Sequence, residues 1–336
     1  MKSIIRRLWR WLPTVLLGTS LLLHLVTVTL YVRLPVRFAA FTVFPIWVWG
    51  IIGLSLAVIP YLFFRKSGSL LLTVIWLITI LLLADEARSL GRVGIDEVTR
   101  GPAPPHAGSK VLRVATLNCG LKANPAKALD SFEPDIVFLQ EVTNPYFAKM
   151  VVDELFDGQG DYRHDALRGC AVAVRGSIRR NLPVTESRCQ LVEVEMYDGR
   201  RLELVNIHLQ SAATNLRLYD RECWWEHRKN RTTRQVELSY ILAHLEQRTS
   251  YPRFPTIIAG DFNAPANDLV YRMLKKNFTD AFDAVGTGWG NTYHRKLPLL
   301  RIDQIYGSSK LIPVRSQAFT VSDTDHRLVI ADFIFR

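Results

Sequence analysis

The sequence predicts an α/β protein in which a sandwich of two β-sheets with helices outside follows a membrane-spanning helical region. Two observations support this prediction. From Val111 onward, short apolar runs alternate with stretches of helical periodicity, which is typical of sheets covered by helices. Before residue 93, three long apolar stretches contain no Asp, Glu, Lys or Arg, as is typical of helices in a bilayer.

Residues 1–92 form the predicted membrane anchor, with about three transmembrane helices at 12–32, 38–64 and 69–84. The first two stretches are long enough to cross a hydrocarbon core, and the third is near the lower limit of about 17 residues. A cleaved secretory signal is the alternative for the first stretch, because basic residues precede it. Two further apolar stretches follow and no small-x-small cleavage site stands out, which favours a retained anchor.

Basic residues predict the orientation of this anchor. With the N-terminus in the cytoplasm, the inner segments carry six Lys and Arg residues and the first outer loop carries Arg33 and Arg37. Three crossings then place the rest of the chain on the non-cytoplasmic side of the cell (plasma or inner) membrane, as a multi-pass protein. Arg88 and Arg92, which follow the third stretch, weaken this signal. If 69–84 does not span the membrane, the rest of the chain lies on the cytoplasmic side instead.

The charge is unevenly distributed along the chain. Of 42 Lys and Arg residues, ten lie in 1–92 beside only two acidic residues, so the net charge of +11 belongs mostly to the anchor. The high isoelectric point is therefore no argument for a nucleic-acid partner. The four cysteines show no Cys-x-x-Cys spacing, which argues against a zinc site. Cys119 and Cys170 fall in apolar strand-like runs that favour buried free thiols, and a disulfide is the alternative.

A Pro- and Gly-rich linker at 93–110 separates the anchor from a catalytic domain at 111–336. Within this domain, Asp198-Gly199 is typical of a hairpin turn. We expect helices near 124–132, 144–156 and 231–247. We expect strands near 111–117, 136–140, 170–175, 190–196, 201–207, 256–260, 302–306 and 328–334.

Polar residues stand at the ends of these strand-like runs. Gly260-Asp261-Phe262-Asn263 places a carboxylate and an amide side by side after an apolar strand, where they suit a water held against phosphorus. Aspartate and asparagine also satisfy turn backbone at strand ends, so this motif alone is weak. The other strand-end residues, in chain order, are Asn118, Glu141, His208, Asp303 and the pair Asp325-His326.

These motifs, in this order over 111–336, resemble the endonuclease/exonuclease/phosphatase superfamily, which includes pancreatic deoxyribonuclease, abasic-site endonucleases, bacterial sphingomyelinases and inositol polyphosphate 5-phosphatases. The resemblance implies a four-layer sandwich of two mixed β-sheets flanked by helices. It also implies metal-dependent hydrolysis of phosphate ester bonds. The family's usual Ser-Asp-His is Thr324-Asp325-His326 here, which leaves the local turn in question. His208 matches the deoxyribonuclease and sphingomyelinase branches, whereas abasic-site enzymes usually lack this histidine.

Phosphate ester hydrolysis needs a cation on the phosphoryl oxygens, an oriented water and a proton for the leaving oxygen. Mg²⁺ prefers hard oxygen ligands, so we expect Glu141 to bind it, with Mn²⁺ as the alternative ion. The resemblance adds Asn118 and Asp325 on the metal side. It implies that Asp261 orients and deprotonates the attacking water and that Asn263 steadies that water or a phosphoryl oxygen. It also implies that His208 assists transition-state charge and leaving-group protonation. His326, oriented by Asp303, is the expected proton donor.

The substrate is less determined by the sequence. Residues 217–234 carry six basic side chains with Trp224 and Trp225 among them, which suits single-stranded nucleic acid, a lipid headgroup interface, or a solvated helix start. Gly288–Tyr293 lies where the family often has a substrate-facing loop. A membrane tether raises the effective concentration of membrane-borne substrate, which favours a lipid-linked phosphate. The alternatives are a tethered or exported nuclease and a catalytically dead membrane receptor; no protein partner is implied.

Overall fold

The computed structural model describes residues 2–65, 68–93, 111–182, 184, 187–247 and 254–336, with side chains from Arg10 onward. These residues divide into two compact units. The first unit comprises residues 1–88 and 216–228, and the second comprises 89–215 and 229–336. Nearly all of the predicted linker, residues 94–110, lies outside the described residues.

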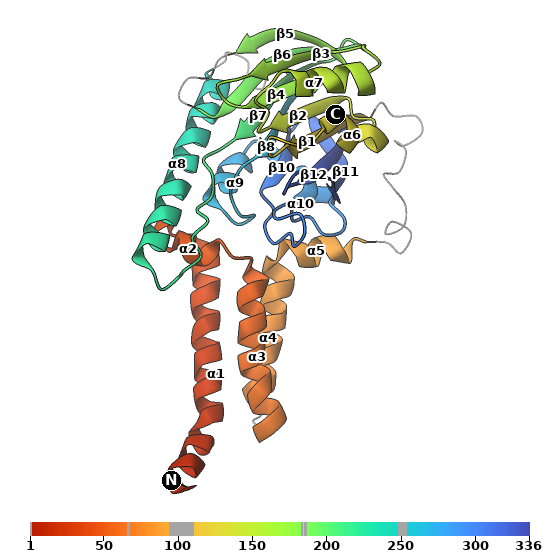
Figure 1. Cartoon of the computed structure of the whole chain (residues 1–336). Coiled ribbons are helices and arrows are strands. Elements are labelled where there is room, and N and C mark those ends of the chain that lie inside the picture. Colours follow the sequence, from red (N-terminus) through yellow and green to blue (C-terminus); the bar gives the residue numbers. More distant parts are fainter. Residues whose placement is uncertain (1, 66–67, 94–110, 183, 185–186, 248–253) are drawn as a thin grey trace. The chain divides into compact units, whose positions relative to one another are not determined.

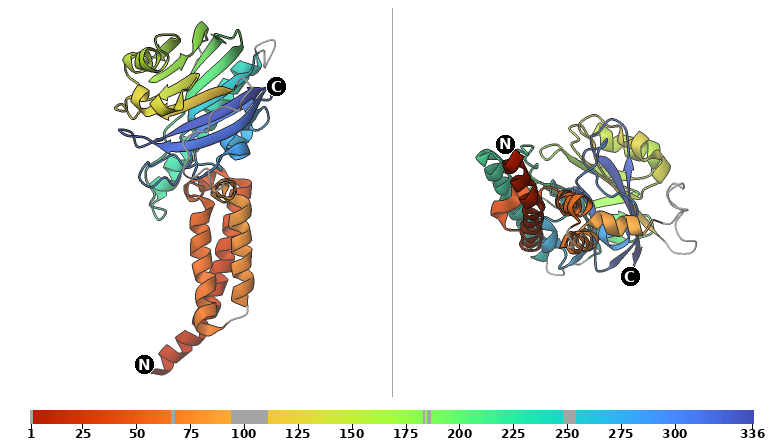
Figure 2. Two further views of the ribbon diagram at one scale, coloured as in Figure 1. Left: turned by 90° about the vertical axis from the view of Figure 1, so that its right-hand side faces the viewer. Right: turned by 90° about the horizontal axis from the view of Figure 1, so that it is seen from below.

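Three long helices lie side by side in the first unit (Figures 1 and 2). Two of them are long and apolar enough to span a membrane, over Arg10–Arg33 and Ile46–Phe64, and the third qualifies only together with the short helix after it, from which it is bent by 76°. The helices of this region are α1 (Lys2–Arg33), η1 (Val36–Phe38), α2 (Ala39–Thr42), α3 (Ile46–Phe64), α4 (Gly68–Leu83) and α5 (Asp85–Gly91).

The second apolar stretch differs from its predicted bounds of 38–64, because its long helix begins only at Ile46. Pro45 precedes that helix and lacks a backbone N–H, and it also disfavours the helical conformation of Phe44. Residues 36–42 instead form two short helical turns that link α1 to α3.

A close contact between small and aromatic residues joins these helices. A Cβ atom added at Gly53 would lie 2.1 Å from the Trp76 ring, so only glycine allows this approach. The Ser20 hydroxyl donates to the Gly53 carbonyl at 2.8 Å and accepts from Trp76 Nε1 at 3.1 Å. Three helices thus meet through one polar contact that fixes their register.

The second unit contains two six-stranded sheets packed face to face (Figures 1 and 2). Their strand orders are β11-β12-β1-β2-β4-β3 and β5-β6-β7-β8-β10-β9. Each sheet is mixed, since β1 and β2 run parallel in one and β7 and β8 in the other, while the remaining neighbours are antiparallel. The strands are β1 (Leu112–Asn118), β2 (Ile136–Gln140), β3 (Asp161–Asp165), β4 (Cys170–Val174), β5 (Gly176–Leu182), β6 (Cys189–Met196), β7 (Arg201–His208), β8 (Thr256–Asp261), β9 (Phe278–Asp280), β10 (Asp303–Ser308), β11 (Leu311–Thr320) and β12 (Arg327–Phe335).

Helices cover the outer faces of both sheets, so the predicted four-layer arrangement is confirmed. Strand alternation builds three cores: in β1, Val114 packs between the sheets and Ala115 packs toward the helices. Leu238 and Val270 place α8 and α9 on the outer face of the second sheet. The helices of this region are α6 (Pro125–Leu129), η2 (Asp130–Phe132), α7 (Tyr146–Met150), the π-helical η3 (Val151–Leu155), α8 (Arg221–Glu246), α9 (Leu269–Leu274) and α10 (Ala281–Val285).

All eight expected strands form, and the structure adds β3, β5, β9 and β11. β3 reads Asp-Tyr-Arg-His-Asp and lies at a sheet edge, where it needs no apolar run. The helix expected at 231–247 begins earlier, at Arg221. The four cysteines are buried free thiols, as the apolar runs around Cys119 and Cys170 indicated for those two.

Candidate active site

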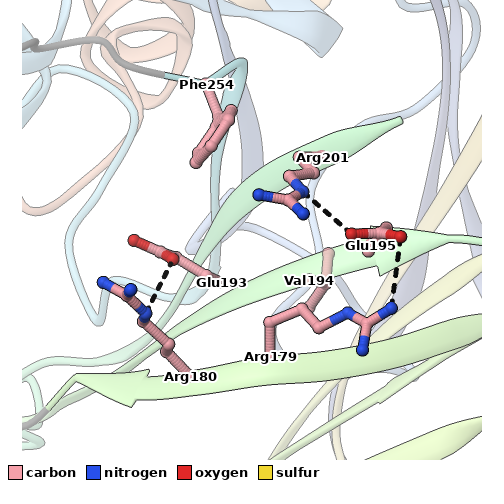
Figure 3. Close-up of a pocket in the computed structure, with 7 residues that line it drawn as sticks. All are labelled: Arg179, Arg180, Glu193, Val194, Glu195, Arg201 and Phe254. Atoms are coloured by element: carbon pink, nitrogen blue, oxygen red, sulfur yellow. Dashed lines mark hydrogen bonds and ion pairs between the residues drawn. The ribbon is translucent and has the colours of Figure 1, made fainter. Parts of the chain in front are cut away.

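Charged side chains gather at several places in the described part of the second unit, and two of these places bear on the predicted site. The first is a surface pocket of about 370 Å³ on β5, β6 and β7 (Figure 3). Its charges pair with one another. Glu195 binds Arg179 at 3.2 Å and Arg201 at 2.8 Å, and Arg180 lies 3.8 Å from Glu193. None of the predicted site residues lines this pocket, so it does not contain the predicted chemistry.

The second place is an edge of the sandwich where strand ends meet. β1 and β2 are parallel and end at Asn118 and Gln140, which are paired in register. In the other sheet, β7 and β8 are parallel and end at His208 and Asp261, which are also paired. The carboxyl ends of parallel strands share an edge, so topology alone brings these polar residues together.

Asp261 lies at the centre of this edge and is buried. Its Oδ2 accepts from Asn118 Nδ2 at 3.0 Å and lies 4.0 Å from His208 Nε2 and 3.9 Å from His326 Nε2. The preceding Gly260 has φ +137°, and a Cβ atom there would lie 2.0 Å from a carbonyl oxygen of β7. Glycine is therefore required for β8 to approach β7 closely where it presents Asp261.

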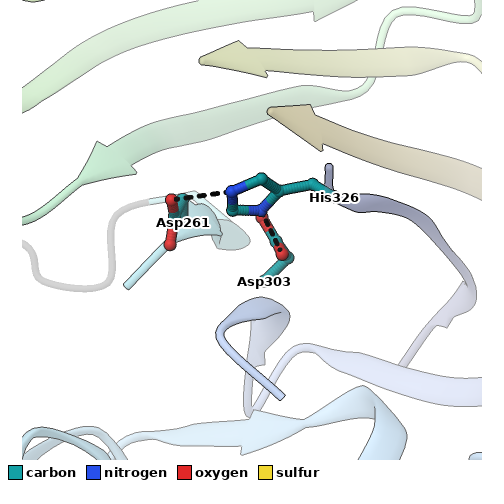
Figure 4. A group of neighbouring side chains, drawn as sticks. All are labelled: Asp261, Asp303 and His326. Carbon is teal, nitrogen blue, oxygen red and sulfur yellow. Dashed lines mark hydrogen bonds and ion pairs between the residues drawn. The ribbon is translucent and has the colours of Figure 1, made fainter. Parts of the chain in front are cut away.

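His326 and Asp303 form a buried pair beside Asp261 (Figure 4). His326 Nδ1 donates to Asp303 Oδ2 at 2.9 Å, which leaves Nε2 directed toward Asp261. The Tyr293 ring packs 5.1 Å from the imidazole, and the Thr292 hydroxyl accepts from the Asp303 amide at 3.1 Å. This is the pairing of Asp303 with His326 that the family resemblance implied.

Mutual electrostatics perturb both titrating groups. Burial, together with the nearby Asp303 carboxylate, raises the pKa of Asp261 to about 6. Burial on its own lowers the pKa of His326, but the charge of Asp303 and its hydrogen bond outweigh this, and with Asp261 and Asp325 they raise the pKa to about 10. Near neutral pH the arrangement therefore favours an ionised Asp261 facing a protonated His326.

Glu141 follows β2 and stands at the more open side of the site. Its Oε1 accepts from Asn118 Nδ2 at 3.1 Å and lies 3.8 Å from His208 Nε2. Glu141 has φ 53°, and Asn263 has φ 51°, both in the left-handed region that is strained for residues other than glycine. Backbone strain of this kind clusters at functional sites, where it aims side chains at a ligand.

The turn before β12 is ordered by a hydroxyl group. Thr324 Oγ1 donates to the Asn118 carbonyl at 2.8 Å and accepts from the His326 amide at 3.2 Å. Threonine thus supplies the hydroxyl expected of serine at this position, and the departure from Ser-Asp-His leaves the turn intact. Asp325 is partly exposed at the rim, with Oδ1 4.0 Å from His326 Nε2.

Comparison with known proteins assigns this architecture. The sequence profile of the Endonuclease/Exonuclease/phosphatase family matches residues 115–326. The chain belongs to this family. No curated protein matches it with significance.

Solved structures of endonuclease/exonuclease/phosphatase proteins share the fold. One from Bacteroides thetaiotaomicron has a TM-score of 0.53 at 16% identity and covers 68% of this chain and 99% of its own. A mannosyl-6-phosphatase from B. thetaiotaomicron VPI-5482 has a TM-score of 0.53 at 16% identity, covering 67% and 100%. One from Bacteroides vulgatus has a TM-score of 0.52 at 16% identity, covering 68% and 100%. At these identities the likeness shows the fold alone.

Two sets of side chains in this family member offer donor atoms to a divalent cation. Asp261, Asp303 and His326 offer ligand atoms within 4.8 Å of one another. Asp303 and His326 already bond to each other, however, which suits a proton-transfer pair better than a metal shell. Glu141 offers a carboxylate on the open side, with the amide of Asn118 orienting it, and hard oxygen donors of this kind fit Mg²⁺.

Several residues that support the site were missed in the sequence. Gln140 Nε2 donates to Asn206 Oδ1 at 2.7 Å across the two sheets, directly beneath the strand ends. Asn206 in turn donates to the Leu139 and Ala171 carbonyls, each at 2.9 Å. Both side chains are buried amides next to apolar residues, Gln140 after Leu139 and Asn206 between Val205 and Ile207, and that exception was the signal that could have identified them. Tyr293 was noticed only as part of a loop.

Proposed function

We propose that this chain is a membrane-anchored, Mg²⁺-dependent phosphoesterase that hydrolyses a phosphate ester or anhydride in a lipid-linked headgroup. The substrate class comprises phospholipids, sphingolipids and polyprenyl phosphates. The observation that carries the proposal is the position of Asp261 Oδ2, within 4.0 Å of donor nitrogens of Asn118, His208 and His326. A buried carboxylate facing two imidazoles is the arrangement that activates a water and protonates a leaving oxygen.

Each proposed role follows from a contact. Asp261 accepts the proton of the attacking water, and His326, held in one tautomer by Asp303, donates a proton to the leaving oxygen. His208 lies between Glu141 and Asp261 and stabilises negative charge in the transition state. Asn263 Nδ2 donates to the Leu209 carbonyl at 3.0 Å, which fixes the amide beside the water position.

Glu141 and Asp325 would hold the metal ion and Asn118 would help to set its shell, with Mn²⁺ as an alternative to Mg²⁺. When bound, the ion supplies positive charge to the phosphoryl oxygens. Asn118 turns its Nδ2 toward the two carboxylates and its Oδ1 toward the Gly120 amide. Its contribution to the metal shell is therefore to orient Glu141.

The helices of the first unit support the anchor. Trp11 and Tyr31 on α1 are 20 residues apart, or about 30 Å along a helix, which matches the hydrocarbon thickness between two aromatic belts. Two basic residues that weakened the topology signal have other partners: Arg88 pairs with Asp85, and Arg92 donates to carbonyls of the second unit. The positive-inside rule counts both arginines regardless of these partners, so six basic residues on the inner segments stand against four on the outer ones. On that balance we propose a non-cytoplasmic catalytic unit.

The test is Mg²⁺-dependent product release by the full chain in lipid nanodiscs. The panel comprises sphingomyelin, phosphoinositides, a polyprenyl pyrophosphate, plasmid DNA and RNA. Asp261→Ala is the blank, and Leu167→Ala, in an exposed hairpin, is the matched control. The proposal is supported if only lipid substrates are hydrolysed, and if Asp261→Ala loses this activity while its thermal unfolding is unchanged. Cleavage of DNA or RNA alone would establish a tethered nuclease, and no turnover with either cation would favour a receptor.

A further inference from the structure

The tryptophan- and arginine-rich stretch of residues 217–234 divides into two parts in the structure. Arg231 and Arg234 are buried, and Arg231 Nε donates to Asp268 Oδ2 at 2.9 Å, so these charges stabilise the interior of the second unit. The remaining part, Leu216–Arg228, belongs to the first unit together with the apolar helices. In the sequence, strands β1 to β7 lie between this segment and those helices.

An aromatic contact fixes this segment to one end of the helices. The Trp224 ring packs edge-on against Phe38 in η1, with centroids 5.9 Å apart and planes at 86°. Trp224 Nε1 donates to the Leu218 carbonyl at 2.7 Å, which folds the segment back on itself. Phe38 lies in the connection between α1 and α3, so Leu216–Arg228 sits at the end of the bundle where α1 finishes and α3 begins.

This end of the bundle is rich in aromatic side chains. Trp49 stacks on Phe41 with centroids 4.0 Å apart, and Trp47 Nε1 donates to Glu86 at 3.1 Å. Aromatic residues of this kind gather where membrane helices leave the hydrocarbon core. The aromatic residues in this connection and at its flanks are Tyr31, Phe38, Phe41, Phe44, Trp47 and Trp49.

The segment also exposes large side chains at the same end. Tyr219 is 88% exposed, Trp225 60% and Leu216 52%. Single exposed apolar residues are ordinary, but three within ten residues beside an aromatic belt indicate a surface made for an amphipathic environment.

The charge of the segment decides between the partners that its composition allowed. Its three arginines, at 217, 221 and 228, are balanced by three acidic residues at 220, 222 and 226. A neutral segment does not attract a polyanion, and nucleic-acid binding without sequence preference depends on such attraction. Charges balanced in number, beside exposed tyrosine and tryptophan, fit the headgroup region of a bilayer instead.

We propose that Leu216–Arg228 is a membrane-interface element whose Tyr219 and Trp225 side chains enter the headgroup region of the bilayer that α1 and α3 span. The inference rests on the proposed membrane anchor and extends it to a segment inserted in the catalytic sequence. Aromatic burial rather than net charge drives the contact, so it is insensitive to ionic strength and independent of anionic lipid.

Spin labels in the full chain test this element. Nitroxide is attached at Tyr219→Cys or Trp225→Cys in phosphatidylcholine nanodiscs, and the four native cysteines are buried and do not compete. Accessibility to oxygen is compared with accessibility to a water-soluble nickel complex. Leu167→Cys, at a 96% exposed residue of the second unit, reports water, and Leu22→Cys, at a 64% exposed residue of α1, reports lipid.

We expect oxygen-to-nickel ratios at positions 219 and 225 several-fold above that at 167 and below that at 22, unchanged by high salt or by added phosphatidylglycerol. If position 22 reads as lipid while 219 and 225 match 167, the interface element is wrong and the anchor stands. If position 22 also matches 167, the anchor itself is wrong. Immobilisation of the labels at 219 and 225 by single-stranded DNA, with water-like accessibility in nanodiscs, would assign the segment to nucleic acid.

Discussion

Asn118 and Asp261 join the two sheets of the second unit through a hydrogen bond of 3.0 Å between the last residues of β1 and β8. Asn118 Nδ2 also donates to Glu141 at 3.1 Å. One amide therefore sets the spacing of the proposed base, the proposed metal ligand and the two sheets that carry them.

Asn118→Ala is expected to lower kcat strongly and to destabilise the fold by about 1–3 kcal/mol, because the buried Asp261 carboxylate loses a donor. Activity and thermal unfolding are the measurements. Asn181→Ala, on the exposed part of β5, is the matched control and should change neither. Full activity in Asn118→Ala would show that the amide does not position the carboxylates.

Because the backbone at Glu141 is left-handed, two substitutions there should be equally inactive but differ in stability. Both Glu141→Ala and Glu141→Gly remove the carboxylate and should abolish turnover and weaken Mn²⁺ binding measured by electron paramagnetic resonance. Glycine accepts φ 53° without strain, so Glu141→Gly should be more stable than Glu141→Ala by about 1 kcal/mol in denaturant unfolding. Equal stabilities would mean that position 141 stores no strain, and unchanged Mn²⁺ affinity would remove Glu141 from the metal site.

The sequence was sufficient to predict that the candidate site residues lie at one edge, because they stand at strand ends. Runs such as Val205-Asn206-Ile207-His208 are buried strands with a polar terminus, and parallel pairing brings such termini to one edge. The contact between Asn118 and Asp261 was not predictable in this way. It depends on how two separate sheets pack, and no local pattern records that distance.

Edge strands and helix starts were predicted least well, for a related reason. β11 contains Pro313 and exposes one side, so it lacks the apolar run that reveals a central strand. The first turns of α8 carry charged residues and tryptophans, and their helical state is stabilised by the contact of Trp224 with Phe38. Long-range packing, rather than periodicity, determines both elements.

The pH profile of kcat/KM is expected to be bell-shaped. Asp261 must be ionised to accept a proton, so activity falls as the pH drops through its raised pKa of about 6. His326 must be protonated to donate, so activity falls as the pH rises through its raised pKa of about 10. The profile is measured on a soluble phosphoester at saturating Mg²⁺.

Asp303→Asn should move both limbs of this pH profile to lower pH. Without the Asp303 charge, burial lowers the pKa of His326, and the alkaline limb moves to lower pH. The acidic limb moves down as well, because Asp303 helps to raise the pKa of Asp261. Asp130→Asn, at an exposed position, should leave both limbs in place. An alkaline limb unmoved by Asp303→Asn would exclude His326 as its source.

Arg92 lies just before the predicted linker and packs within the second compact unit, which includes residues from Ser89 onward. The guanidinium donates to three carbonyls at the end of α10: Phe282 at 3.4 Å, Gly286 at 3.2 Å and Asp283 at 2.8 Å. A cation suits the carboxyl end of a helix, because the unpaired carbonyls there carry partial negative charge.

Arg92→Ala should loosen α10 without unfolding the sheets. A loss of about 1 kcal/mol corresponds to roughly fivefold faster hydrogen exchange of the amides at 281–286. A chain that begins at Val111 should show the same acceleration, since it lacks the same contact. Arg88→Ala is the matched control, because Arg88 pairs with Asp85 in the first unit. Equal exchange in the Arg88 and Arg92 variants would show that the Arg92 contact does not hold α10.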